Sequence, residues 1–243
     1  MEGIRLESES DVARLLQVHR YAQVGRCVNG VTHDINNLLG AAMAYAELAS
    51  FDPAVSPETA RMLGQIVEGA TKCSELVKSL TSIARRDRAD INLVSLEKLL
   101  DEVLLLLDYE FKMAQITFER RVASGLEPLP VDLPRLKIAL LYLLLNAQQA
   151  VRGKEGRIVR VSIGNTADGV CIEVWDSGGG LDPEIADSAF EPLTSFWGEG
   201  DHLGMGLYMA RQVAEMHGGQ LQFDADRGFC LSIKRRHDMN DLV

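Results

Sequence analysis

The sequence lacks any apolar run long enough to cross a membrane. The richest run, from Ile138 to Leu145, is about eight residues long and contains Tyr142, whereas a spanning helix needs about 20 mostly apolar residues. No signal peptide opens the chain. We therefore expect a cytoplasmic protein without membrane insertion.

An excess of positive charge is also missing. The chain has 25 Lys and Arg residues against 35 Asp and Glu residues, and its formal net charge is -10. The one basic cluster, residues 234–236, is short, and we interpret it as a solvated chain end. A nucleic-acid partner is not expected, because it would have no electrostatic support.

Cysteine is scarce, and its spacing shows no metal-like pairing. The four cysteines are Cys27, Cys73, Cys171 and Cys230, which favours small buried thiols in a reduced cytoplasmic setting. The remaining composition, 47% hydrophobic and 25% charged over 243 residues, is ordinary for a globular protein of one large domain or two small ones.

A long helical pattern occupies the first part of the chain. Proline is absent from Leu6 to Phe51, and we expect one helix from about Ser10 to Ser50. Its apolar residues recur in steps of four and three, close to a coiled-coil seam. They are Val24, Val28, Val31, Ile35, Leu38, Ala42, Tyr45 and Ala49.

His33 lies beside this seam, between Val31 and Ile35. Asn37 is one helical turn further on the same side, and Asp34 is the next residue round. An imidazole beside a carboxylate and an amide is a reasonable nucleophile site, because the carboxylate can hold the ring tautomer and accept a proton. A partly exposed histidine in a polar surface patch is the alternative.

A second helix is expected after a break at Phe51 to Pro57. Ser56 caps it, with Pro57 at the first position and Glu58 in the first turn. Its seam contains Leu63, Ile66, Ala70, Cys73, Val77, Leu80 and Ala84. Two long helices and a short loop predict an antiparallel hairpin. We infer a homodimer, two hairpins forming a four-helix bundle; the alternative is that both seams pack on the rest of the chain.

A polar linker at residues 85–90 marks the domain boundary, so the predicted domains are 1–88 and 89–243. In the second domain we expect strands at 91–94, 116–122, 158–164, 170–176, 220–224 and 229–234, and helices at 96–112, 133–151 and 205–216. Ser95 and Asp132 are the expected N-caps. This order predicts an α+β sandwich, a mostly antiparallel sheet with helices on one face.

Two polar residues stand out in this second domain. Asn146 lies in a strongly apolar helix, and its amide oxygen can ligate magnesium, which prefers oxygen and phosphate partners. Asp176 follows a strand, where a carboxylate can accept the amino group of a purine. A hydrogen-bonded core asparagine and a strand followed by a flexible turn are the respective alternatives.

Glycines follow both of these positions. Gly178 and Gly180 let the backbone approach a ring or a phosphate closely. Gly204 and Gly206 open a helix, where backbone amides bind phosphate. Each pair alone is weak support, since glycines before helices and in turns are common.

Together and in this order, these features resemble the ATP-binding domain of bacterial sensor histidine kinases, the Bergerat-type ATPase fold. Asn146 matches the N box, residues 176–180 the DxGxG box, residues 190–192 the F box and residues 204–207 the last glycine box. Residues 33–39 resemble the HDFNNLL form of the H box. The likeness extends from about Gly25 to Gly219.

The resemblance implies a two-component histidine kinase. His33 would accept the γ-phosphoryl group of ATP and pass it to an aspartate of a response regulator receiver domain. Asp34 would orient or deprotonate His33, and Asn37 would position the water when the regulator is dephosphorylated. Residues 1–88 would thus be the dimerisation and histidine phosphotransfer hairpin.

For residues 89–243, the resemblance implies an ATP-binding catalytic domain that uses ATP and Mg2+. Asn146 would hold the magnesium ion, and Asp176 would bind adenine. The glycines would shape the nucleotide pocket and close on the phosphates; they are Gly178, Gly180, Gly204 and Gly206.

Several positions depart from the family pattern. Tyr142 stands where the N box often has asparagine, and His202 stands where a first glycine is usual. The lid, residues 193–201, has no lysine and carries two carboxylates; Phe196 and Trp197 within it suit packing or partner binding. These departures favour one alternative, a dimeric phosphotransfer or scaffold protein with a degenerate ATP domain. An ATPase switch without phosphotransfer is a third hypothesis, which His33 on a dimer hairpin opposes.

No sensor domain is visible. About twenty residues before the His33 region are too few to fold into one. We expect either input from a separate partner protein or a core taken from a longer chain.

Overall fold

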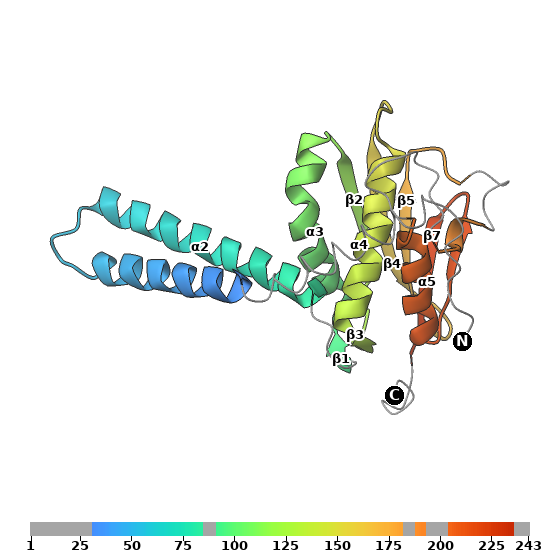
Figure 1. Ribbon diagram of the computed structural model, residues 1–243, viewed down its shortest axis with the longest axis horizontal. Coiled ribbons are helices and arrows are strands. Elements are labelled where there is room, and N and C mark those ends of the chain that lie inside the picture. Colours follow the sequence, from blue (N-terminus) through green and yellow to red (C-terminus); the bar gives the residue numbers. More distant parts are fainter. Residues whose placement is uncertain (1–30, 85–90, 182–187, 193–203, 236–243) are drawn as a thin grey trace, which may run out of the picture. The chain divides into compact units, whose positions relative to one another are not determined.

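The computed structural model describes residues 31–84, 91–181, 188–192 and 204–235. The chain divides into two compact units, Met1–Arg86 and Asp87–Val243 (Figure 1). The predicted boundary between residues 88 and 89 and the start of the first predicted helix lie outside the described residues. Within the described ranges, no helix has both the length and the apolar character needed to span a membrane.

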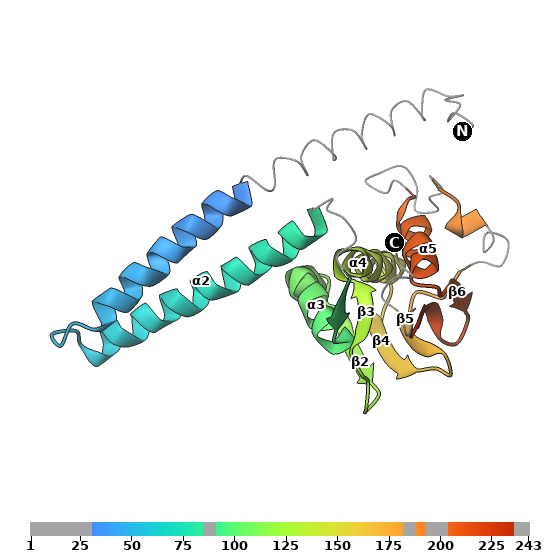
Figure 2. The same cartoon turned by 90° about the horizontal axis from the view of Figure 1, so that it is seen from below.

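The first unit contains a helical hairpin. Residues 31–50 are helical, and α2 runs from Pro57 to Ala84 (Figures 1 and 2). Ser56 caps α2 as predicted, since its hydroxyl accepts a hydrogen bond from the Thr59 amide at 3.1 Å. The Ser74 hydroxyl donates to the Asn36 side chain at 3.2 Å and so joins the two helices.

In the first helix of the hairpin, the residues that pack against the second helix are not those of the predicted seam. On residues 31–50, the least exposed side chains form a heptad row shifted by one residue from the prediction: Thr32, Asn36, Leu39, Met43 and Ala46. The predicted row faces solvent in the single chain, with Leu38 72% and Tyr45 73% exposed. Both rows have the coiled-coil spacing, so periodicity alone could not separate them.

Helix α2 shows the same division. Leu63, Ala70 and Val77 from the predicted seam are half-buried or buried, whereas Ile66 and Cys73 are exposed. The hairpin therefore has an inner row that joins its helices and an outer apolar row that the single chain leaves uncovered.

The second unit is an α+β sandwich, as predicted. Its strands are β1 Ile91–Val94, β2 Thr117–Val122, β3 Leu129–Asp132, β4 Ile158–Asn165, β5 Gly169–Asp176, β6 Leu221–Asp224 and β7 Gly228–Lys234. Its helices are α3 Leu96–Met113, α4 Leu133–Ala150, α5 Gly206–Met216 and the short η1 Ser188–Phe190.

The main sheet has the order β2-β4-β5-β7-β6. Its pairs are antiparallel except β2 with β4, which run parallel. The strands β1 and β3 form a separate antiparallel pair, with Val94 opposite Leu129. Strand β3 was missed from sequence because it has only four residues, contains Pro130, and runs directly into the helix cap.

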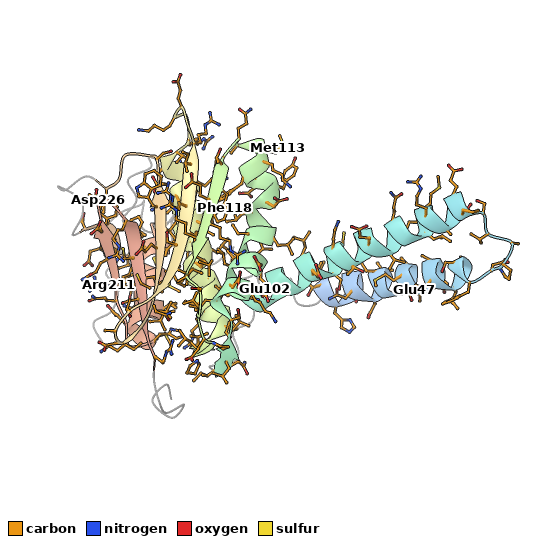
Figure 3. The ribbon with its side chains drawn as sticks, turned by 180° about the vertical axis from the view of Figure 1, so that it is seen from behind. Glu47, Glu102, Met113, Phe118, Arg211 and Asp226 are labelled. Carbon is orange, nitrogen blue, oxygen red and sulfur yellow. The ribbon has the colours of Figure 1, made fainter. Side chains whose placement is uncertain are left out.

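Helices α3, α4 and α5 cover one face of the main sheet (Figure 2). Alternation along the strands decides which side chains meet them. On β5, Val170, Ile172 and Val174 are fully buried in the core, so Cys171 and Glu173 point to the other face. At the β2 edge, the Phe118 ring reaches the Phe111 ring of α3 with centroids 6.2 Å apart (Figure 3).

The predicted caps position the two longest helices of this unit. Ser95 accepts from the Lys98 amide at 3.4 Å, and Asp132 accepts from the Arg135 amide at 3.2 Å. The buried His217 ring reinforces the second cap, because its Nε2 accepts the Asp132 backbone N–H at 2.9 Å. This contact ties the end of α5 to the start of α4.

Candidate functional site

His33 is exposed on the helix of residues 31–50, with its side chain 76% accessible. Its Nδ1 atom lies 3.2 Å from Asn37 Nδ2 and 3.6 Å from Asp34 Oδ1. The second distance is longer than a hydrogen bond. Both contacts involve Nδ1, so the other ring nitrogen, Nε2, is directed away from these neighbours. The structure thus brings together the three hairpin residues that the sequence singled out.

In the other unit, one face of α4 carries the second group of predicted residues. A Cβ placed on Gly206 would meet the Tyr142 side chain at 3.5 Å, an ordinary contact. Two turns further along α4, a Cβ placed on Gly178 would lie only 2.5 Å from the Ala150 carbonyl oxygen. Asn146 is four residues from each contact on α4, so it lies on the same helix face between the two glycine segments.

Asp176 is the last residue of β5, at the turn that leads to these glycines. Its Oδ1 accepts a hydrogen bond from the Gly178 amide at 2.9 Å. Burial raises the pKa of the Asp176 carboxyl, and the Gly178 amide partly opposes this shift. The Ser177 hydroxyl fixes the same turn, because it accepts from the Ile158 amide at 3.0 Å and donates to the Gly156 carbonyl.

A cavity of about 360 Å³ opens beside Asp176. It is lined by Trp175, Asp176, Ser177, Gly179, Gly180, Phe223, Ala225 and Gly228. Gly180 has a φ of +78°, and a Cβ there would lie 3.1 Å from the Phe223 ring. Phe223 was not predicted as part of this cavity, because the only sequence signal at this position is the alternation of its strand, which does not indicate a pocket.

The start of α5 supplies a place for an anion. Gly204 has a φ of +65°, which glycine adopts easily, and the helix begins at Gly206. The N-cap, Met205, makes no side-chain hydrogen bond to the first amides of this helix. Those amides and the helix dipole are suited to phosphate groups. His202 and the lid residues 193–201 lie outside the described residues.

Burial raises the pKa of the Tyr142 hydroxyl, so the tyrosine stays neutral and can act as a hydrogen-bond donor on the α4 face beside Gly206. Compared with the asparagine often found at this position of the N box, Tyr142 offers a hydroxyl in place of a side-chain amide and adds no charge.

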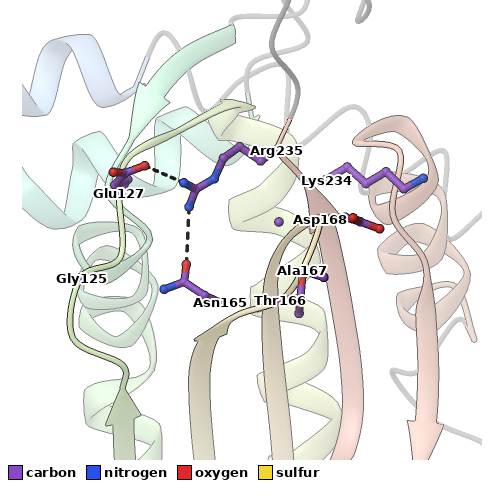
Figure 4. A pocket seen from close by; sticks show the side chains of 9 residues that line it. Gly125, Glu127, Asn165, Thr166, Ala167, Asp168, Lys234 and Arg235 are labelled. Atoms are coloured by element: carbon purple, nitrogen blue, oxygen red, sulfur yellow. Dashed lines mark hydrogen bonds and ion pairs between the residues drawn. The ribbon is translucent and has the colours of Figure 1, made fainter.

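A larger cavity, about 520 Å³, lies at the opposite end of the strands, where β4 turns into β5 (Figure 4). Arg235 crosses it, contacting Glu127 at 2.5 Å and Asn165 at 3.4 Å. None of the predicted site residues lines this cavity. The larger of the two cavities is therefore not the one beside the predicted residues.

The second unit also resembles known proteins in sequence. Residues 131–237 match the sequence model of the histidine kinase-, DNA gyrase B- and HSP90-like ATPase family. This range contains every residue predicted to bind nucleotide. The matched range lies within the second unit.

Among curated proteins, the chain is similar to the signal transduction histidine-protein kinase AtoS of Escherichia coli (strain K12), at 26% identity over 89% of this chain and 35% of AtoS. It also resembles the sensor histidine kinase ZraS of the same strain, at 27% identity over 84% of this chain and 43% of ZraS. The chain thus spans less than half the length of these relatives.

Solved structures share the fold. The catalytic domain of histidine kinase ThkA aligns with a TM-score of 0.53 and 23% identity, over 60% of this chain and 96% of that domain. The structure of ThkA in complex with the response regulator protein TrrA aligns with a TM-score of 0.51 and 19% identity, over 96% of this chain and 68% of ThkA.

Proposed function

We propose that this chain is the core of a two-component histidine kinase. It phosphorylates itself on His33 with ATP and transfers the group to an aspartate of a response regulator. The observation that carries the proposal is an ATPase-family domain containing Asn146 and Asp176, in a chain whose other unit exposes a histidine beside a carboxylate and an amide.

In this mechanism the exposed Nε2 of His33 attacks the γ-phosphorus. The bond from phosphorus to the leaving oxygen of ADP breaks as the N–P bond forms. The Asn37 amino group, which donates to Nδ1 at 3.2 Å, must first turn away so that Nδ1 carries the ring proton. Asp34, 3.6 Å from Nδ1, then stabilises that proton after a small side-chain movement. Asn37, 3.2 Å from the same ring, would position water during dephosphorylation of the regulator.

The ATP domain supplies positioning and charge neutralisation, on which phosphoryl transfer mainly depends. Asp176 accepts the adenine amino group, and the first amides of α5 receive phosphate oxygens. Asn146 suits Mg2+, because its amide oxygen is a hard ligand and this ion usually takes few protein ligands together with phosphates and water.

The outer apolar row of the hairpin supports a homodimer. Its large side chains, 37–73% exposed in the single chain, are Val31, Ile35, Leu38, Tyr45, Leu48, Met62, Ile66 and Leu76. Exposing such an apolar row to water is unfavourable in free energy. A second copy of the hairpin would cover it in a four-helix bundle.

The proposed partner is a response regulator receiver domain, which the ThkA–TrrA complex supports through the shared fold. Signal input would come from a separate protein or from a further segment of a longer chain. The net charge of -10 makes nucleic acid an unsuitable partner. We place the activity in the cytoplasm, where ATP and receiver domains are available.

The test is incubation of the chain with γ-labelled ATP and Mg2+. We expect acid-labile label on the wild type, none on His33→Gln, and roughly 100-fold less on Asn146→Ala. Glu47→Gln is the matched control, since Glu47 lies exposed on the helix that carries His33 (Figure 3), and it should label normally.

Absence of label on a folded wild-type dimer, together with no Mg2+-dependent nucleotide binding by calorimetry, would overturn the kinase proposal. The dimeric phosphotransfer scaffold would then stand in its place. Tyr142 favours that alternative, because it stands where the N box of active kinases often has asparagine.

A further inference from the structure

Two cysteines and a glutamate meet on the face of the main sheet opposite the helices. Cys171 and Glu173 alternate with the buried core residues of β5, so both point away from α4 and α5. On β7, Cys230 is directly opposite Glu173, and Ser232 is opposite Cys171. The sequence alone does not reveal this group, because Cys171 and Cys230 are far apart along the chain.

The three ligand atoms, two sulfurs and a carboxylate oxygen, all lie within 4.8 Å of one another. Cys171 is buried, while Glu173 and Cys230 are half-buried. A tetrahedral zinc site has Zn–S bonds of about 2.3 Å, which places its sulfurs about 3.8 Å apart. The group therefore needs only small side-chain adjustments to surround an ion.

Cys171 and Cys230 are diagonal neighbours on the same face of the β5–β7 pair. The Cys230 sulfur also lies 3.7 Å from the Gly228 carbonyl oxygen, which limits its rotamers. Thiolate is the form that binds metal, so binding requires both thiols to lose their protons.

Glu173 is held by a neighbouring cation. Arg227 Nε donates to Glu173 Oε1 at 2.8 Å, and its guanidinium also forms an ion pair with the same oxygen. A ligating carboxylate usually has such an outer partner, which orients it. These two contacts with Arg227 both use Oε1 and leave Oε2 out.

There is room for a further ligand beside Cys171. Gly164 is its partner on β4, and a Cβ placed on Gly164 would meet nothing within 4 Å. A water molecule can therefore complete four-coordination from the open side of the sheet.

From these contacts we propose that Cys171, Cys230 and Glu173 form a binding site for a soft divalent cation of the zinc class. Binding releases the thiol protons to solvent and leaves the sulfurs in the same oxidation state. The ion joins β5 to β7 three residues before Asp176, so it stabilises the strand that carries the adenine-binding carboxylate. The site does not depend on the kinase activity proposed above.

The test uses the full chain. Its cysteines are first reduced, the reductant is then removed under an oxygen-free atmosphere, and the protein is titrated with Co2+ as the only added metal. We expect thiolate-to-cobalt charge-transfer bands and the d–d bands of tetrahedral Co2+, saturating at one ion per chain, and their loss when Zn2+ is added. Zn2+ should also raise the Tm of the wild type.

Cys230→Ser and Cys171→Ser should abolish the charge-transfer bands at one equivalent, and Glu173→Gln should weaken Co2+ binding at least about tenfold. The matched control is Cys73→Ser, since Cys73 is an exposed cysteine of the hairpin, and it should bind like the wild type. Circular dichroism checks that each variant is folded; Cys230 is half-buried, so its variant serves if Cys171→Ser unfolds.

Tetrahedral bands that persist in Cys230→Ser, or a wild type that gives none while free-thiol titration shows every cysteine reduced, would overturn the proposal. Neither readout requires ATP, so failure here is distinguishable from failure of the kinase assay.

Discussion

Asp176 combines two demands that oppose each other. The proposed contact with adenine needs an ionised carboxylate, yet partial burial raises the pKa of Asp176 above the ordinary 3.8. The unfolded chain therefore ionises first as pH rises, and the cost of burying the charge appears between the two pKa values. That cost is absent below 3.8 and fully present above the raised native pKa. Stability from this residue thus falls as pH rises through the window.

Asp176→Asn separates binding from stability. We expect the variant to unfold at the same or higher urea concentration than the wild type at neutral pH, and this difference to vanish below pH 3.8. Nucleotide affinity should fall at least about tenfold, because the amide presents a weaker acceptor. Urea unfolding and calorimetry with an ATP analogue measure the two effects.

Ser177→Ala is the control at the same turn. It removes the hydroxyl that bridges Ile158 and Gly156, which should cost stability by about 1 kcal/mol without changing the pH dependence. A pH profile for Asp176→Asn that matches the wild type would contradict the assigned burial cost.

At the scale of elements, the turn after β5 is fitted against the end of α4. A Cβ on Gly178 would lie 2.5 Å from the Ala150 carbonyl oxygen and 2.7 Å from its Cβ. Backbone cannot move aside as a flexible side chain does. The close approach therefore requires glycine, and it places the end of β5 beside the α4 face that carries Asn146.

Gly178→Ala is expected to destabilise the second unit by about 1–3 kcal/mol, because the added methyl forces the turn away from α4. Nucleotide affinity should fall with it. Gly164→Ala is the control in the same sheet, since a Cβ there meets nothing within 4 Å, and it should unfold like the wild type. A Gly178→Ala variant as stable as the control would show that the turn relaxes without cost.

At the scale of the whole molecule, the proposed dimer depends on the outer row of the hairpin. Leu38 and Tyr45 are 72% and 73% exposed in the single chain, and a second hairpin would bury both. A carboxylate at either position would then be desolvated at the centre of the interface.

Leu38→Glu and Tyr45→Glu should therefore shift the chain from dimer to monomer, seen as a halved mass by sedimentation equilibrium. Tyr45→Phe should remain dimeric, because it keeps the apolar ring. A wild type that sediments as a monomer, or glutamate variants that remain dimers, would contradict the four-helix bundle.

The sequence by itself determined much of the local structure, and it predicted the candidate site residues. The helix caps at Ser56, Ser95 and Asp132 depend only on residues within one helical turn, and the predicted capping hydrogen bonds are present. The order of Asn146, the glycine turns and the final helix needed no tertiary information either, since spacing along the chain carries it.

Only the tertiary structure decided which groups meet across the chain. It selected one of two heptad rows one residue apart for packing within the hairpin, paired β1 with β3, and joined His217 to the Asp132 amide. It also brought Cys171 to Cys230. The physical reason is that periodicity determines which side chains of a helix or strand share a face. Which segment packs against that face depends on side-chain packing and strand register, and these involve residues far away in the sequence.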